Sequence, residues 1–193
     1  MKFSHKHKFI FVAALMVFVL QTGCAGANAD LATQMPSNQT VTSSTQDTQN
    51  MNLTQIQAGD YSSLLGNWIL VAYADNLFDG KGQQWHAGAP DTVTATLSVS
   101  SDKIVFNDTA MVMQGNTLTD DAGSHLLSFV NDGTSLDAYL ADAYTAITWG
   151  VTFYPKGVAN NLEPNNGVQI DNSKNLIVVY YSGMRVETVF EQQ

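Results

Sequence analysis

The side chains best suited to bind a ligand lie between Tyr73 and Asp91, in the stretch YADNLFDGKGQQWHAGAPD. Tyr73, Phe78 and Trp85 supply aromatic faces that can stack on a sugar ring or cover an apolar ligand, and His86 adds a titratable nitrogen. The stretch follows the first strand-like segment and contains several glycines, and a connection of this length in a small domain is often functional. The alternative is that these aromatic side chains anchor the connection to the wall of the domain.

Catalytic side chains are scarce elsewhere. His86 and His125 are the only histidines after residue 7, and neither belongs to an H-x-H or H-x-x-x-H pair that would indicate zinc. No G-x-S-x-G sequence indicates a serine nucleophile, and the acidic loops do not match the calcium-binding D-x-D-x-D-G pattern. A Ser–His–Asp set or an acid pair drawn from distant residues stays open. We expect a protein that is not an enzyme and that uses no metal and no cofactor.

The first residues, MKFSHKHKFIFVAALMVFVLQTGC, predict export. Three lysines precede an apolar run from Phe9 to Leu20, which is too short to span a bilayer but has the length of a signal-peptide core. We predict residues 1–23 as the signal peptide.

Removing that signal makes the chain more acidic. Five Lys and Arg side chains then stand against seventeen Asp and Glu, so the formal net charge becomes −12 in place of −9. A chain with this charge has no basic patch for phosphates, so we expect no nucleic-acid partner. Anionic membrane surfaces would also repel it, so any membrane attachment must come from a lipid.

Cys24 is the only cysteine, and its position predicts a lipid anchor. The sequence LQTGC resembles the bacterial lipobox, in which a cysteine after a small residue receives diacylglycerol and becomes the mature N-terminus. Gly23 fits this pattern, and Gln21 departs from the usual aliphatic residue. Because two acyl chains give stable anchoring, the expected location is the extracellular face of the cytoplasmic membrane. The alternative is cleavage after Ala29, in the sequence ANA, and release as a secreted protein.

Two further segments follow from the composition. Residues 24–50 are rich in Ser, Thr, Gln, Asn and Ala, so they predict a disordered tether that holds the folded part away from the membrane. Residues 51–193 have the length of a single domain.

The domain is dominated by short segments rich in Val, Ile, Thr, Tyr and Phe, with turn signals such as SSDK, QGN and NDG between them. These segments are 67–74, 92–99, 103–107, 110–114, 125–130, 146–154, 175–181 and 184–190. They predict an all-β fold, a small antiparallel barrel, with a β-sandwich as the alternative. Apolar spacing also predicts a short N-terminal helix over 52–58 ended by Gly59, a helical turn after it, and a helix over 135–144.

Gly66-Asn67-Trp68 resembles the G-x-W sequence at which the first strand of lipocalin-like barrels begins. The resemblance implies a helical turn that passes close beneath the sheet at Gly66, with Trp68 closing one end of the barrel. It also implies that the connection over 73–91 covers the open end. We expect Asp60 to cap the turn, and Tyr61, Leu64 and Leu65 to complete the floor with Trp68.

A longer resemblance covers 51–68, MNLTQIQAGDYSSLLGNW. It is similar to a module of uncharacterised lipoproteins of lactic acid bacteria and streptococci, with the pattern M-[ND]-x-x-Q-I-x-x-G-D-[YF]-S-S-[LI]-x-G-T-W. Met51, Gly59, Asp60, Gly66 and Trp68 are among the positions that fit, and Asn67 replaces the usual Thr. FYPKGV (153–158) and DNSKNLI (171–177) resemble a later segment, whose form D-x-S-K-D-R-I differs at Asn175 and Leu176. The resemblance implies location and architecture and no activity.

Three hypotheses for function follow. The first is a surface-anchored, non-enzymatic module that binds a small ligand or a cell-wall component. The second is a structural or interaction domain without a ligand cavity. The third, an extracellular hydrolase, has the least support because candidate catalytic residues are few.

Overall fold

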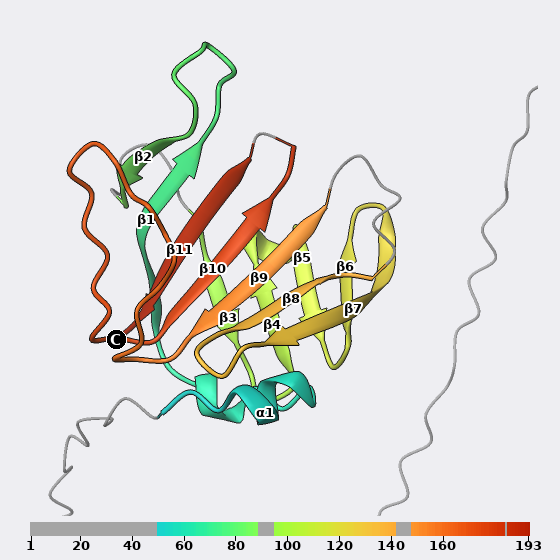
Figure 1. Cartoon of the computed structure of the whole chain (residues 1–193). Helices are drawn as coiled ribbons and strands as arrows, with labels where there is room; N and C mark the ends of the chain where they lie inside the picture. Colours follow the sequence, from blue (N-terminus) through green and yellow to red (C-terminus); the bar gives the residue numbers. More distant parts are fainter. Residues whose placement is uncertain (1–49, 89–94, 142–147, 184) are drawn as a thin grey trace, which may run out of the picture. The chain divides into compact units, whose positions relative to one another are not determined.

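One antiparallel sheet makes up almost all of the domain. The computed structural model describes residues 50–88, 95–141, 148–183 and 185–193. The sheet has the strand order β2-β1-β11-β10-β9-β8-β7-β6-β5-β4-β3 and curls into a half-barrel (Figure 1). The predicted all-β, antiparallel, lipocalin-like fold is therefore confirmed, and a single continuous sheet replaces the two sheets of the sandwich alternative.

The elements have the following bounds in chain order. They are α1 Leu53–Gln57, η1 Ser62–Leu64, β1 Trp68–Asp75, β2 Gln84–Ala87, β3 Leu97–Val99, β4 Lys103–Phe106, η2 Asn107–Thr109, β5 Met111–Gln114, β6 Thr117–Asp120, β7 Gly123–Asn131, β8 Leu136–Leu140, β9 Trp149–Tyr154, β10 Leu176–Tyr181 and β11 Val186–Gln192.

The sheet is an up-and-down meander from β3 to β11, and the first strand joins its end. Each strand from β3 to β11 pairs with the next one in the chain, and β1 pairs with β11. The short strand β3 at the far edge approaches β1 to within 8 Å between Cα atoms, so the curl brings the two ends of the meander together. Because neighbours in sequence pair with each other, turn signals between β-type segments were good guides to this topology.

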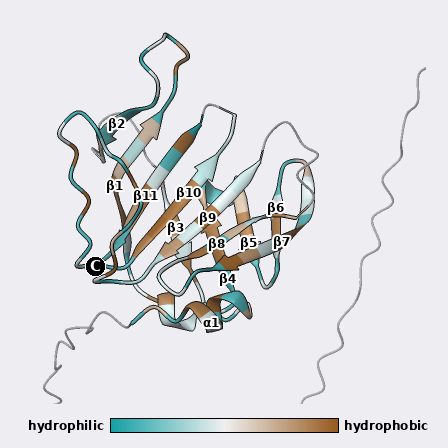
Figure 2. Ribbon diagram, viewed as in Figure 1, coloured by the Kyte–Doolittle hydropathy of each residue, from teal (hydrophilic) through white to brown (hydrophobic). Residues whose placement is uncertain are grey.

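Alternating side chains divide the sheet into an inner and an outer face. On β8, Leu136, Ala138 and Leu140 point inward and are buried. Val151 and Phe153 on the neighbouring β9 do the same. These residues belong to one inner core, to which most strands contribute. The floor end of the half-barrel is therefore filled with side chains, and Figure 2 shows the central β10 as hydrophobic over most of its length.

The helical module lies across one end of the strands (Figure 1). The side chain of Asn52 caps α1 by accepting a hydrogen bond from the Gln55 backbone N–H, and Gly59 ends the turn with φ 82°. A Cβ atom on Gly59 would lie 2.6 Å from Cα of Gly115, in the β5–β6 turn. The Tyr61 hydroxyl donates to the carbonyl of the same Gly115 at 2.9 Å. Glycine at 59 therefore allows the module to sit directly on the sheet.

Asp60 and Trp68 hold this floor as predicted. The Asp60 carboxylate accepts from the Ser62 backbone N–H at 3.0 Å, and the hydrogen bonds from Ser62 lower its pKa. Trp68 is buried, and its Nε1 donates to the Leu64 carbonyl at 2.9 Å. Leu65 was expected in the floor, but it is 42% exposed, since η1 ends before it and its backbone is already extended (φ −60°, ψ 137°).

Two secondary-structure predictions were wrong. The helix expected over 135–144 is instead β8, because Leu136, Ala138 and Leu140 alternate inward between β7 and β9. The long connection expected over 73–91 is in large part a β-hairpin. Strand β1 continues to Asp75, and β2 returns beside it.

A bulge in β1 sets the direction of that hairpin. The β1–β11 register shifts between Leu70 and Ala72. Leu70 packs on the inner core, whereas Ala72 and Ala74 belong to a second, outer cluster together with Trp85. The bulge thus changes which face the alternate residues occupy, and it turns the side chain of Trp85 to the outer face.

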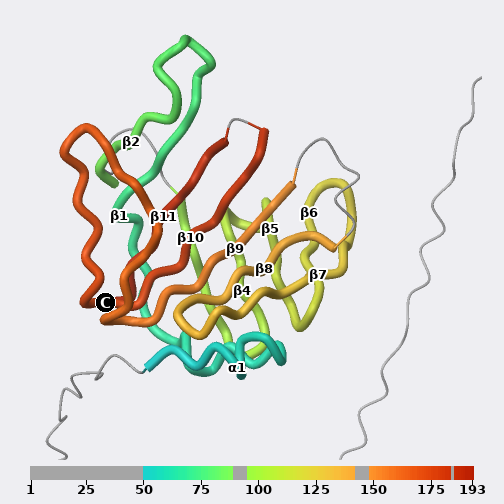
Figure 3. Tube along the Cα trace, in the orientation of Figure 1, coloured from blue at the N-terminus to red at the C-terminus, as the bar shows by residue number. Residues whose placement is uncertain are grey.

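The connection from 155 to 175, between β9 and β10, covers part of the outer face. Its residues Leu162, Val168 and Ile170 pack on the outer cluster, while most of its other side chains are exposed. Figures 2 and 3 show this long, largely hydrophilic segment passing beside β11 and β1. It forms one wall of the site described next.

Some predictions lie outside the described residues. They are the signal peptide 1–23, Cys24, the cleavage after Ala29, nearly all of the tether 24–50, and the parts of predicted segments at 89–94, 142–147 and 184.

Candidate functional site

The four aromatic and histidine candidates do not form one site. Tyr73 and His86 are register partners in the β1–β2 hairpin, and their rings stack with centroids 4.7 Å apart. His86 Nε2 lies 3.7 Å from an oxygen of Asp75, and the His86 side chain is 42% exposed. Phe78 lies apart from them in the hairpin turn, where it is 68% exposed with φ 57°.

Trp85 points to the opposite face from its neighbour His86. Its side chain is 4% exposed and packs in the outer cluster, so it anchors the hairpin to the wall of the sheet, which was the alternative to a ligand-stacking role. It also forms one side of a surface hollow of about 450 Å³, so the two roles are compatible.

That hollow is one half of a longer groove on the outer face of the sheet. The first hollow is lined by Gln83, Trp85, Glu163, Asn165 and the shared residues described below. A second hollow of about 360 Å³ lies over β8, β9 and β10. Asn161, Leu162 and Glu187 line both, so the two hollows adjoin each other at these residues, and we call them together the outer groove.

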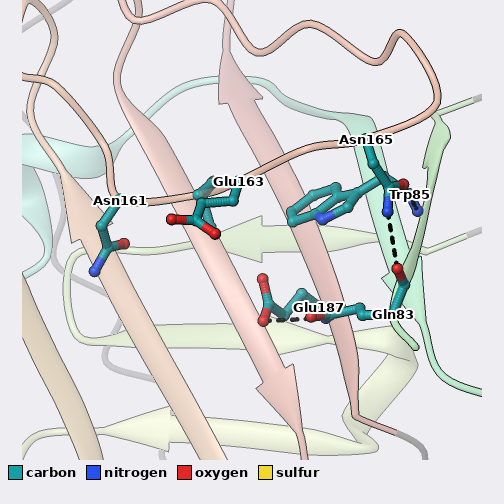
Figure 4. Close-up of a pocket in the computed structure, with 7 residues that line it drawn as sticks. Gln83, Trp85, Asn161, Glu163, Asn165 and Glu187 are labelled. Carbon is teal, nitrogen blue, oxygen red and sulfur yellow. Dashed lines mark hydrogen bonds between the residues drawn. The ribbon is translucent and has the colours of Figure 1, made fainter. Parts of the chain in front are cut away.

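The wall of the outer groove is held by an asparagine that binds the edge of β2. Asn165 Oδ1 accepts from the Trp85 backbone N–H, and Nδ2 donates to the Gln83 carbonyl, each at 2.9 Å. The side-chain amide thus pairs with a strand edge as a peptide group would. Figure 4 shows Asn161, Glu163 and Asn165 reaching from the connection over the strands.

Glu187 rises from the floor of the first hollow, on β11. One of its carboxylate oxygens accepts from Gln83 Nε2 at 3.2 Å. In Figure 4 its carboxylate points toward that of Glu163 across the groove. Both groups stand where hydroxyl or amine donors of a ligand could reach them.

The floor of the second hollow is a ladder of outward residues. Tyr139, Gly150, Tyr180 and Glu187 occupy one row of register partners across β8, β9, β10 and β11. The next row contains Asp137 and Thr152, whose hydroxyl donates to the Asp137 carboxylate at 2.7 Å. Tyrosine rings, a hydroxyl and carboxylates therefore lie side by side on the outer face of paired strands.

The charge of the outer groove is negative. Asp137, Glu163 and Glu187 line it, and none of its described lining residues is Lys or Arg. The Tyr154 hydroxyl donates to Asn161 Oδ1 at the junction of the two hollows. Burial raises the pKa of Tyr154, and the negative charge of Asp137 raises it further, so the phenol stays protonated and remains a donor. An anionic ligand would be repelled here.

A smaller, apolar hollow lies where β9 begins and β10 ends, at Trp149 and Tyr181. Figure 1 shows these strand ends on the side of the sheet away from α1. The hollow measures about 230 Å³, and Phe106, Trp149 and Tyr181 are among the residues that line it. Trp149 Nε1 donates to Asp120 at 3.0 Å, and Asp120 lies 3.5 Å from His125 Nε2. We call this the mouth hollow.

Most residues of the outer groove were missed by sequence reasoning. Trp85 was selected, but Tyr139, Tyr180, Glu163 and Glu187 were not, because they come from strands and a connection far apart in the chain. The available signal was the stretch 155–175, which lacks strand-like periodicity and has two Asn-Asn pairs between two strong strands.

Among the described residues, no group of three or more His, Cys, Asp or Glu side chains has a metal-binding arrangement. In the same part of the chain, no helix is long and apolar enough to cross a bilayer.

Comparisons with protein-family models, with curated proteins and with solved structures give no match for this chain.

Proposed function

We propose that this chain is a non-enzymatic binding module displayed outside the cell, and that the outer groove holds a saccharide of the cell wall. The observation that carries the proposal is the groove itself, two hollows of about 450 and 360 Å³ joined at Asn161, Leu162 and Glu187. These volumes are typical of ligand sites. Because the floor is a paired sheet, little conformational entropy would be lost on binding.

The side chains of the groove match the chemistry of a sugar. A pyranose ring has apolar C–H faces, which pack on aromatic rings such as those of Tyr139 and Tyr180, and hydroxyl groups at its edge. Glu163 and Glu187 can accept hydrogen bonds from those hydroxyls. The negative charge favours a neutral or amine-bearing saccharide over a phosphorylated one.

The proposed location rests on the N-terminal sequence. The signal peptide 1–23 exports the chain, diacylation of Cys24 attaches it to the extracellular face of the membrane, and the tether 24–50 gives the domain reach into the wall. Release after Ala29 is the alternative. Native mass spectrometry of the protein from its own cells separates the two, because only the first adds the mass of a diacylglyceryl group to a chain that begins at residue 24.

The mouth hollow supports a second candidate, the binding of a small apolar ligand. The observation that favours it is the set of aromatic rings around about 230 Å³ of space, with Trp149 in ring contact with both Phe106 and Tyr181. The hollow is smaller than most ligand sites, and the interior near the floor is filled. We therefore rank it below the outer groove.

Calorimetric titration tests the proposal. The processed protein is titrated with solubilised wall polysaccharide and with chitohexaose, cellohexaose and mannohexaose. We expect at least one of them to bind, and Glu163→Ala to weaken binding roughly fivefold, since one hydrogen bond to a ligand is worth about 1 kcal/mol. Asp121→Asn is the matched control, because this exposed acid lies in the β6–β7 turn and does not line the groove.

Other results would point elsewhere. If no saccharide binds, the interaction domain without a ligand replaces this proposal. If reducing ends appear during incubation and are lost in Glu187→Gln, the protein is a hydrolase. A retained apolar molecule, displaced in Trp149→Ala, would identify the mouth hollow as the site.

A further inference from the structure

Gly150 has no structural reason to be a glycine. It lies inside β9 between two paired strands, and its φ is not in the left-handed region that favours glycine. A Cβ atom there would meet only ordinary contacts, 3.7 Å from the Ala138 carbonyl oxygen and 3.8 Å from Cβ of Tyr180. The fold therefore accepts alanine at this position.

Glycine at such a position weakens the strand. Glycine loses more backbone conformational entropy on folding than alanine does, and it has no side chain to pack. The domain contains a contrasting case in Gly59, where φ is 82° and a Cβ would meet Gly115 at 2.6 Å. Gly59 is thus explained by the fold, and Gly150 is not.

The register places Gly150 between two tyrosines. Tyr139 on β8 and Tyr180 on β10 are its direct partners, and all three residues face outward on the floor of the second hollow. Tyr139 is 44% exposed, so its ring is available to a ligand. Directly paired Cβ atoms lie about 5 Å apart, so the missing side chain leaves a slot one residue wide between two aromatic rings.

We propose that Gly150 is a specificity-determining residue, which lets a sugar ring of the bound saccharide enter the slot between Tyr139 and Tyr180. The proposal rests on the proposed function and adds the position of one ring. The ring packs its C–H face on a tyrosine and its edge against the bare backbone of β9, a close approach that glycine allows. Glu187, next in the same row, then lies within reach of the hydroxyls of the neighbouring sugar.

A simpler account is that a tyrosine ring lies over the glycine and covers it. Aromatic residues across a strand pair can shield a glycine in this way. Under that account, a side chain at 150 pushes on the ring of Tyr180, whose Cδ1 is 3.9 Å from the Cβ position, and has no effect on a ligand. The two accounts predict different pairs of results for stability and binding.

Gly150→Ala and Gly150→Val are compared with wild type in thermal unfolding and in titration with the hexasaccharide that binds best. We expect an unchanged or higher melting temperature for both variants, and binding weakened by roughly tenfold or more, the effect of one methyl group in a fitted site. Ser128→Thr is the matched control, because Ser128 flanks Tyr139 on its other side, in β7, and does not line the second hollow.

The tyrosines provide a second, independent readout. Tyr139→Phe should retain most of the affinity and Tyr139→Ala should lose it, since the ring and not the hydroxyl carries the contact. Saturation-transfer NMR should show magnetisation passing from tyrosine ring protons to sugar C–H protons in wild type and not in Gly150→Val.

The failures are distinguishable. If a saccharide binds, Glu163→Ala weakens it, and the Gly150 variants bind like wild type, the slot is wrong and the proposed function stands. If the Gly150 variants melt earlier, the ring of Tyr180 already fills the slot, and the inference is overturned. If no saccharide binds wild type, both proposals fail.

Discussion

Asn175 donates a hydrogen bond through Nδ2 to Oε1 of Gln192 across 2.6 Å, and both side chains are buried. Asn175 Oδ1 accepts from the Lys156 backbone N–H at 2.8 Å, and Gln192 Nε2 donates to the Leu65 carbonyl at 2.9 Å. A backbone N–H can only donate and a carbonyl can only accept, so the direction of every bond in this series is fixed. The series joins the β9–β10 connection, the end of β11 and the helical module at the floor of the sheet.

Asn175→Asp should therefore destabilise the domain. The substitution places a carboxylate oxygen against Gln192 Oε1, and turning the Gln192 amide moves the same conflict to the Leu65 carbonyl. We expect a loss of about 3 kcal/mol in the free energy of unfolding at pH 7, because one oxygen of the buried carboxylate would face another acceptor in place of the hydrogen bond that the amide donates. Urea unfolding measures it.

The stability lost in Asn175→Asp should depend on pH in a defined direction. Burial raises the pKa of a carboxyl, and the protonated acid could donate to Gln192, so stability should return as the pH is lowered through that raised value. Asn172→Asp is the control, because its exposed side chain only accepts in its hydrogen bond with Asn160. Equal losses in the two variants would contradict the fixed direction of the series.

Gly59 and Gly115 give a second paired prediction. Both have positive φ, 82° and 58°, but only a Cβ on Gly59 would meet another atom within 4 Å. Gly115→Ala should cost about 1 kcal/mol of unfolding free energy, the cost of the backbone conformation alone. Gly59→Ala adds a clash of backbone with backbone, so we expect about 3 kcal/mol. If denaturant unfolding gives similar losses of unfolding free energy for the two variants, the helical module does not pack directly on the β5–β6 turn.

The floor could be predicted from the sequence because its contacts are local. Asn52, Gly59, Asp60 and Trp68 lie within one short stretch, and each acts through a cap, a turn or a bond to a near neighbour. Most strands were also found, since β-type segments and turn signals alternate along a meander.

The errors have a physical cause in longer-range packing. At 135–144 the spacing of Leu136 and Leu140 fits one helix face and also alternate positions of a strand, and only pairing with β7 and β9 decides between them. Strand β2 was missed because its short sequence, Gln84 to Ala87, has a strand-like pattern only when it is paired with β1.

The outer groove was beyond sequence reasoning for a related reason. Tyr139, Gly150 and Tyr180 become neighbours through strand register, and a shift of one residue would turn them to the inner face. Asn175 and Leu176, where the chain departs from the lipoprotein pattern, are both buried, so these departures belong to packing and not to the groove.

The turn between β7 and β8 should make stability depend on acid pH. Asp132 accepts hydrogen bonds from the backbone N–H groups of Ser135 and Thr134, and these bonds lower its pKa to about 2. A lowered pKa in the folded state contributes stability above the unfolded value near 4, and this contribution is lost as the pH falls toward 2. In Asp132→Asn, unfolding midpoints in urea between pH 5 and 2 should fall less steeply than in wild type. Parallel curves would contradict the role of this carboxylate.

Asn165 should control the wall of the outer groove without controlling the fold. Its amide accepts from the Trp85 N–H and donates to the Gln83 carbonyl at the edge of β2, and its side chain is otherwise exposed. Asn165→Ala should raise the hydrogen-exchange rate of the Trp85 amide about tenfold while changing the global unfolding free energy by less than about 1 kcal/mol. Asn165→Asp keeps the acceptor for the Trp85 N–H and loses the donor to the Gln83 carbonyl, so the Trp85 amide should stay better protected than in Asn165→Ala. Asn166→Ala is the matched control, because Asn166 bonds the Trp85 carbonyl and not its N–H. If Asn165→Ala leaves exchange at Trp85 unchanged, the other contacts of the connection hold the groove wall, among them Val168 in the outer cluster, and the Asn165 amide does not.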